Sequence, residues 1–65
     1  MAIVQILETV SDEEGCGHIK ALVGTDEYAL YFDGGGTLAA VEVNGDGDAD
    51  YDEDLVEEII EASFQ

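Results

Sequence analysis

The sequence predicts a small α+β fold, in which an antiparallel β-sheet of three to four strands has one C-terminal helix packed on it. Several short segments alternate apolar and polar residues, as half-buried strands do, and turn-forming glycines and aspartates separate them. Near the C-terminus the apolar residues recur instead at helical spacing. A chain of 65 residues has room for one small domain, so we take residues 1–65 as a single unit.

The first segment, residues 2–10 (AIVQILETV), is compatible with two structures. Its apolar residues fit one face of a helix, whereas its β-branched residues and its lack of an N-cap favour a strand. A strand places Val4, Ile6 and Val10 on one side, with Glu8 as the misfit. We favour the strand and keep the helix as the alternative. The segment has no basic start and is too short to span a bilayer, so we expect neither a signal peptide nor a membrane anchor.

Three further segments are typical of strands, residues 18–24, 28–33 and 37–43, and the sequence SDEEGCG provides the first turn. The sequence DGGGT, between the last two segments, predicts a hairpin because consecutive glycines supply positive φ angles. In residues 18–24 we expect one strand face to carry His18, Lys20 and Leu22, and the other to carry Ile19, Ala21 and Val23. In residues 28–33 the two faces are Tyr28, Leu30 and Phe32 on one side and Ala29 and Tyr31 on the other. In residues 37–43 the expected core face is Ala39, Val41 and Val43, and Glu42 points away from it.

The last segment predicts an amphipathic helix. Glutamates occupy one face, and the apolar residues of the other face are Leu55, Val56, Ile59, Ile60 and Phe64. Asp50, with Glu53 three residues later, resembles a capping box just before the apolar run. Acidic residues early in this helix also suit the positive end of its dipole.

Charge is the dominant feature of the composition, with 17 acidic residues against a single lysine and a formal net charge of −16. Hydrophobic residues still make up 46% of the chain, which is too many for a disordered acidic tail. An abundance of Asp and Glu with almost no Lys resembles the proteins of haloarchaea, which live with molar salt inside the cell. In such salt the Debye length is about 3 Å, and most self-repulsion is screened. Lys20 alone cannot neutralise a phosphate backbone, so we expect no direct nucleic-acid binding.

Residues 42–53 raise the question of a cation site. The oxygen-bearing residues recur at every second position, and Gly47 lies where a calcium loop turns sharply. This segment resembles a single EF-hand or dockerin-type calcium loop. By that resemblance the calcium ligands would be Glu42, Asn44, Asp46, Asp48 (through its carbonyl), Asp50 and Glu53. Asp and Gly also fill solvated connectors in salt-adapted proteins, so we favour a connector without a cofactor and keep calcium binding as the alternative.

The remaining chemistry is sparse. Cys16 is the only cysteine, which excludes an internal disulfide and suits a reducing compartment, and we expect a cytoplasmic protein. Cys16 and His18 are the only residues that could support a thiol- or metal-dependent activity, and they lack a partner that would orient them. We therefore expect a non-catalytic interaction module that forms a homo-oligomer or binds a larger protein, and that does not bind membranes. Its expected interface residues are Leu22, Tyr28 and Tyr31.

Overall fold

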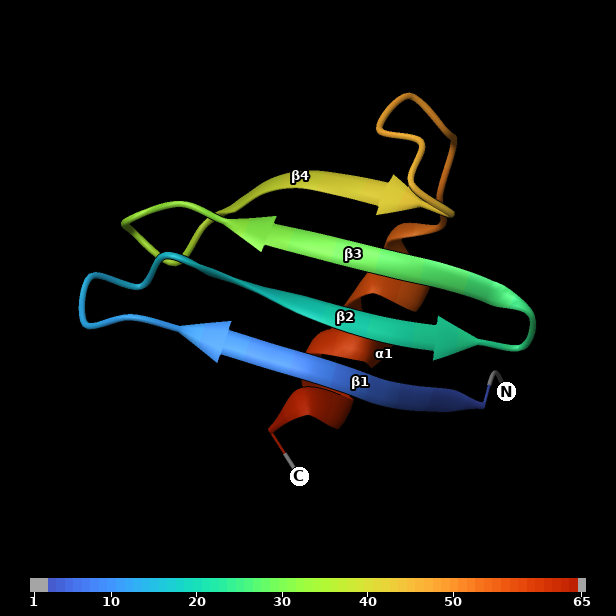
Figure 1. The fold of residues 1–65 in the computed structure, drawn as a ribbon, viewed down its shortest axis with the longest axis horizontal. Coiled ribbons are helices and arrows are strands. Elements are labelled where there is room, and N and C mark those ends of the chain that lie inside the picture. Colours follow the sequence, from blue (N-terminus) through green and yellow to red (C-terminus); the bar gives the residue numbers. More distant parts are fainter. Residues whose placement is uncertain (1–2, 65) are drawn as a thin grey trace.

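The computed structural model describes residues 3–64 and confirms the predicted α+β fold. Four strands form one antiparallel sheet in the order β1-β2-β3-β4, and the single helix α1 crosses one face of it, behind the sheet in Figure 1. The elements are β1 (Val4–Ser11), β2 (Gly17–Val23), β3 (Asp26–Phe32), β4 (Leu38–Val43) and α1 (Glu53–Ser63).

Residues Val4–Ser11 form strand β1, so the first segment is a strand and not a helix, and its pairing explains why Glu8 does not fit a regular alternation. The pairing with β2 shifts between Ile6 and Glu8, which is the mark of a β-bulge at Leu7. Val4 and Ile6 pack against the core, as expected for a strand. Beyond the bulge the alternation is inverted, so that Val10 lies on the other face and is 49% exposed. The prediction that Val10 shares a face with Val4 and Ile6 is therefore wrong.

The core lies between the sheet and α1. Leu30 of β3 and Ile59 of α1 are both fully buried, and the cluster around them is Ile19, Ala21, Tyr28, Val41 and Val56. Ala39 was expected in this core but is exposed. A second register shift, between Tyr31 and Phe32, pairs Phe32 with Leu38 and leaves Ala39 without a partner, so Leu38 takes the inward position.

Two loops at the same end of the sheet share one design. In the loop after β1, the Asp12 carboxylate accepts hydrogen bonds from the backbone N–H groups of Glu14 and Cys16, each at 2.9 Å. In the predicted DGGGT hairpin, Asp33 accepts in the same way from the second and fourth residues after it, at 3.0 and 3.2 Å. Each loop has a glycine with positive φ three residues after its aspartate. These aspartates are structural parts of tight loops.

The helix begins two residues later than the capping-box expectation. Asp52 is the N-cap, and its carboxylate accepts a hydrogen bond of 2.9 Å from the backbone N–H of Asp54. Asp50 therefore lies outside the helix, and Glu53 is its first residue. At the other end Phe64 is the C-cap and is 83% exposed, so it does not join the predicted apolar face. Among residues 3–64, no helix has the length and apolar character needed to cross a lipid bilayer.

Candidate functional site

The face of the sheet opposite α1 is not covered by any other element of residues 3–64, and Figure 1 views the molecule from this side. We call this surface the open face. The pairing registers assign residues to it, because side chains paired directly across an antiparallel sheet point the same way. The open face consists of Gln5, Glu8, Val10, His18, Lys20, Leu22, Glu27, Ala29, Tyr31, Ala40 and Glu42.

One row of the open face is aromatic and apolar. It runs across all four strands as Val10, His18, Tyr31 and Ala40. The rings of His18 and Tyr31 lie side by side, with centroids 6.1 Å apart and planes tilted by 56°. This geometry is typical of aromatic contact. The row thus forms an aromatic and aliphatic ridge across the exposed surface of the sheet.

His18 is held in place by Glu8. Its Nε2–H donates a hydrogen bond of 2.6 Å to Glu8 Oε2, across the β1–β2 pair. This hydrogen bond lowers the pKa of the Glu8 carboxyl, and the nearby charges of His18 and Lys20 add to the effect. Both side chains keep access to solvent, at 26% for His18 and 51% for Glu8. The pair orients the imidazole while leaving it available at the surface.

The neighbouring rows hold the rest of the predicted interface. Leu22 lies on the open face between Gln5 and Glu27, and like Tyr31 it is half-buried. Tyr28 is different, because it points to the helix side and is only 8% exposed in the core. The structure therefore brings Leu22 and Tyr31 to one surface and separates Tyr28 from them. Val10 and His18 were not among the predicted interface residues. His18 was expected on the same strand face as Leu22, whereas Val10 reaches this face only through the bulge.

The segment 42–53 does not form a single loop around a common centre. Asn44 (φ 55°) and Gly45 (φ 83°) form a two-residue hairpin turn, closed by hydrogen bonds of 3.0 and 3.1 Å between Val43 and Asp46. An Asn-Gly pair with positive φ at both positions is the usual sequence of a type I′ turn. This Asn-Gly signal is present in the sequence and would have predicted the turn.

The residues proposed as calcium ligands have other hydrogen-bond partners, belong to different elements or are exposed. The Asn44 amide oxygen accepts from the backbone N–H of Glu27 at 2.9 Å, and its Nδ2 donates to Asp26 at 3.2 Å. The Asp46 carboxylate accepts from the backbone N–H of Asp48 at 2.9 Å. Glu42 lies in β4 on the open face, Glu53 is in α1, and Asp48 and Asp50 are exposed. Within residues 3–64, no three acidic, histidine or cysteine side chains are grouped as a metal ion requires.

Cys16 and His18 are engaged separately. Cys16 is a free, half-buried thiol in the loop before β2, and its backbone is fixed by Asp12. The His18 imidazole hydrogen-bonds to Glu8 instead. The geometry thus gives this pair no shared contact among the described residues.

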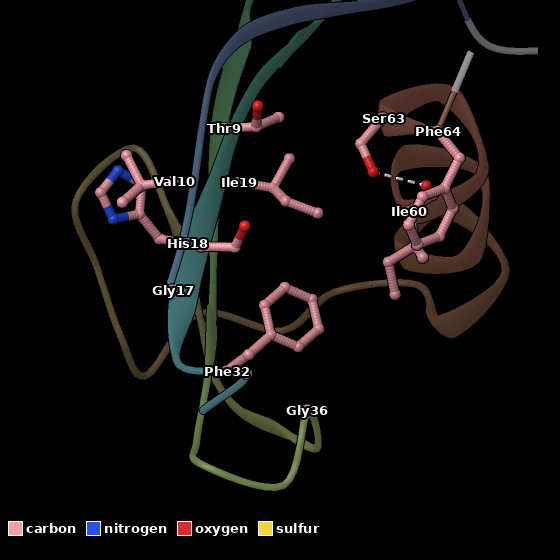
Figure 2. A pocket seen from close by; sticks show the side chains of 12 residues that line it. Thr9, Val10, Gly17, His18, Ile19, Phe32, Gly36, Ile60, Ser63 and Phe64 are labelled. Atoms are coloured by element: carbon pink, nitrogen blue, oxygen red, sulfur yellow. Dashed lines mark hydrogen bonds between the residues drawn. The ribbon is translucent and has the colours of Figure 1, made fainter. Parts of the chain in front are cut away.

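A shallow cleft of about 460 Å³ opens between the sheet and the end of α1. Figure 2 shows Thr9, Ile19 and Phe32 pointing from the sheet toward Ile60 and Phe64 of the helix end, while Val10 and His18 point to the opposite side. The Ser63 hydroxyl in this cleft already donates to the Ile60 carbonyl at 2.6 Å. The cleft is a gap in apolar packing where the last helical turn leaves the sheet.

Comparisons of this chain with protein-family models, with curated proteins and with solved structures found no match. The open face is therefore the feature of this chain from which a function can be inferred.

Proposed function

We propose that this protein is a salt-adapted, non-catalytic interaction module, whose open face binds another protein surface. The observation that carries the proposal is the uncovered ridge of Val10, His18 and Tyr31 with Leu22 beside it, on a sheet that α1 covers on one side only. Antiparallel sheets usually expose a polar face to water. Aromatic and aliphatic side chains on such a face favour contact with a partner.

The composition supports the adaptation to salt. A formal charge of −16 on so small a domain requires counterions at high concentration if the chain is to stay folded. At high salt the apolar contacts of an interface remain effective, whereas long-range charge attraction is screened. An interaction built on a sheet face is thus suited to the solvent that the charge implies.

Lys20 lies on the open face and carries the only side-chain amine in the sequence, so the rate of its acylation measures how accessible this face is. Its acylation rate at molar KCl should fall, relative to an added lysine peptide, when a partner covers the face. The measurement compares dilute pure protein, concentrated pure protein and a high-salt lysate of the source cells. The Cys16 thiol, in a loop off the open face, is the control and should alkylate equally in all three.

Tyr31→Ala should abolish the protection of Lys20, because it removes the largest apolar side chain of the open face. Tyr51→Ala is the matched control, since Tyr51 is 43% exposed and lies outside the open face. Equal acylation of wild-type Lys20 in all three samples would overturn the proposal. Protection that survives Tyr31→Ala would place the contact on another surface.

A further inference from the structure

Asn44 is the only asparagine in the sequence, and Gly45 follows it directly. An asparagine before glycine is especially prone to spontaneous deamidation, because glycine has no Cβ to hinder the approach of its backbone nitrogen to the asparagine amide. Both residues are exposed to solvent. Burial therefore does not protect this amide, and any protection must come from the conformation in which the turn holds it.

The folded turn holds the Asn44 amide at both ends. Its Oδ1 accepts a hydrogen bond of 2.9 Å from the backbone N–H of Glu27, and its Nδ2 donates one of 3.2 Å to the Asp26 carboxylate. The backbone N–H of Asn44 also donates to the Glu27 carbonyl oxygen, at 2.7 Å. The side chain is thus bound to the start of β3, and it cannot meet the nitrogen of Gly45 without losing its own two bonds.

We propose that Asn44 is a deamidation site that the folded turn keeps closed and that unfolding opens. In the reaction the backbone nitrogen of Gly45 loses its proton and forms a bond to Cγ of Asn44. The bond from Cγ to Nδ2 breaks, and Nδ2 leaves with that proton as ammonia. The five-membered succinimide that remains then adds water and opens to an aspartate or an isoaspartate at position 44. Water is the only co-reactant.

Either product weakens the turn that the asparagine forms. An aspartate at position 44 places a carboxylate oxygen where Nδ2 now donates to Asp26 over 3.2 Å, so two negative charges face each other. An isoaspartate adds a carbon to the main chain inside a two-residue turn, where the bonds between Val43 and Asp46 fix the backbone length. A chain that is modified while unfolded therefore does not regain this turn, and its unfolding becomes irreversible.

The mass change at residue 44 tests the site. Wild-type chain is incubated at molar KCl and mildly alkaline pH, with and without enough urea to unfold it, because urea leaves the ionic strength unchanged. A peptide of residues 41–48 in the same two solutions corrects for any effect of urea on the reaction itself. The folded chain should lose the amide at least about tenfold more slowly than the unfolded chain, because the reaction must first open the turn and its hydrogen bonds. A smaller ratio overturns the inference.

Two substitutions locate the protection. Asp26→Ala removes the acceptor for Nδ2, and should speed the loss of the amide in the folded chain by about threefold or more at equal folded fraction. Asp48→Ala is the matched control, since Asp48 is an exposed aspartate of the same segment whose described hydrogen bond is made by its backbone N–H. It should leave the folded rate within about twofold of the wild type. Equal folded rates for the two variants overturn the assignment of the protection to the Asn44 side chain.

Refolding gives a second readout. Wild-type chain held in urea and returned to molar KCl should lose its recoverable circular dichroism in step with the loss of the amide. Asn44→Gly is the control and should recover fully, because glycine suits a positive φ in this turn and has no amide to lose. If Asn44→Gly or Asp26→Ala does not fold, modified and unmodified wild-type chains, separated by charge, still decide the question. Equal refolding of the two overturns the proposed irreversibility.

Discussion

Removing salt should unfold this protein, and the size of the effect follows from its charge and dimensions. The Cα radius of gyration is 11.0 Å, which corresponds to a sphere of about 14 Å radius. The unfolded chain has a radius of gyration of about 24 Å, so its charges are much further apart. With the −16 charge spread over each sphere, folding costs about 10 kcal/mol of repulsion at 0.15 M salt and about 5 kcal/mol at 1 M.

This difference of about 5 kcal/mol is comparable to the whole stability of a domain of this size, about 3–10 kcal/mol. We therefore expect urea unfolding at 1 M KCl to give a cooperative transition, and the same chain at 0.15 M KCl to be largely unfolded. Urea is the suitable denaturant because it is uncharged and leaves the ionic strength unchanged. The titration should be repeated at a tenfold higher chain concentration, so that the contribution of association is measured separately.

A charge-reduced variant tests whether repulsion is the cause. Glu57, Glu58 and Glu61 are exposed on α1, and their replacement by Gln removes three of the excess negative charges. Repulsion scales with the square of the net charge, so the stability gained from salt should fall by about one third. If salt acts instead by strengthening apolar burial, the triple variant will show the wild-type salt dependence. That result would refute the electrostatic reasoning.

Three other outcomes are expected at molar KCl. Asn44→Ala should lower the free energy of unfolding in urea by about 1–3 kcal/mol, because it strains a positive-φ turn and removes the acceptor for the Glu27 N–H. The loss should be the same with EDTA and with calcium. A loss of stability seen only in the calcium sample would favour the metal site. Ile59→Ala should cost about 2–5 kcal/mol and Ile59→Val about 0.5–1.5 kcal/mol, because this side chain is fully buried; equal costs for the two would contradict its place in the core. The wild type should be more stable than Glu8→Gln above pH 4.5, because the hydrogen bond from His18 lowers the pKa of the Glu8 carboxyl in the folded state. This advantage should be lost as the pH falls through that lowered pKa. A stability difference that does not change with pH would show that the ion pair is not its source.

The sequence predicted the fold class and most of the sheet because alternation and helical spacing reflect a single buried layer. Ile19, Leu30 and Val41 alternate along their strands with residues of the opposite sheet face, and each is buried. Within the sheet, the residues assigned to the wrong face, Val10 and Ala39, follow the two register shifts. A bulge adds one residue to a strand without a distinctive residue type, so the inversion at Val10 and the exposure of Ala39 depend on pairing with another strand.

The candidate site was predictable only in part for the same reason. Leu22 and Tyr31 follow from alternation, since each comes directly after a core residue, Ala21 or Leu30, in a regular stretch of β2 or β3. Tyr28 was grouped with them on its residue type, and its core position was implied by its own alternation with Tyr31. The bond between Glu8 and His18 could not be foreseen, because it joins residues brought together by the shifted register of β1.

Two groups of acidic residues differ in the contacts they make, and this difference limits what the composition alone can explain. Asp12, Asp33, Asp46 and Asp52 each accept a backbone N–H within a loop or at the start of α1. Such aspartates are required by local geometry at any salt concentration. The exposed glutamates of α1 have no such role among the described contacts, so the proposed adaptation to salt depends on them more than on the aspartates. An acidic loop in a chain of this kind can therefore resemble a cation site while its side chains accept hydrogen bonds from the backbone, as those of Asn44 and Asp46 do here.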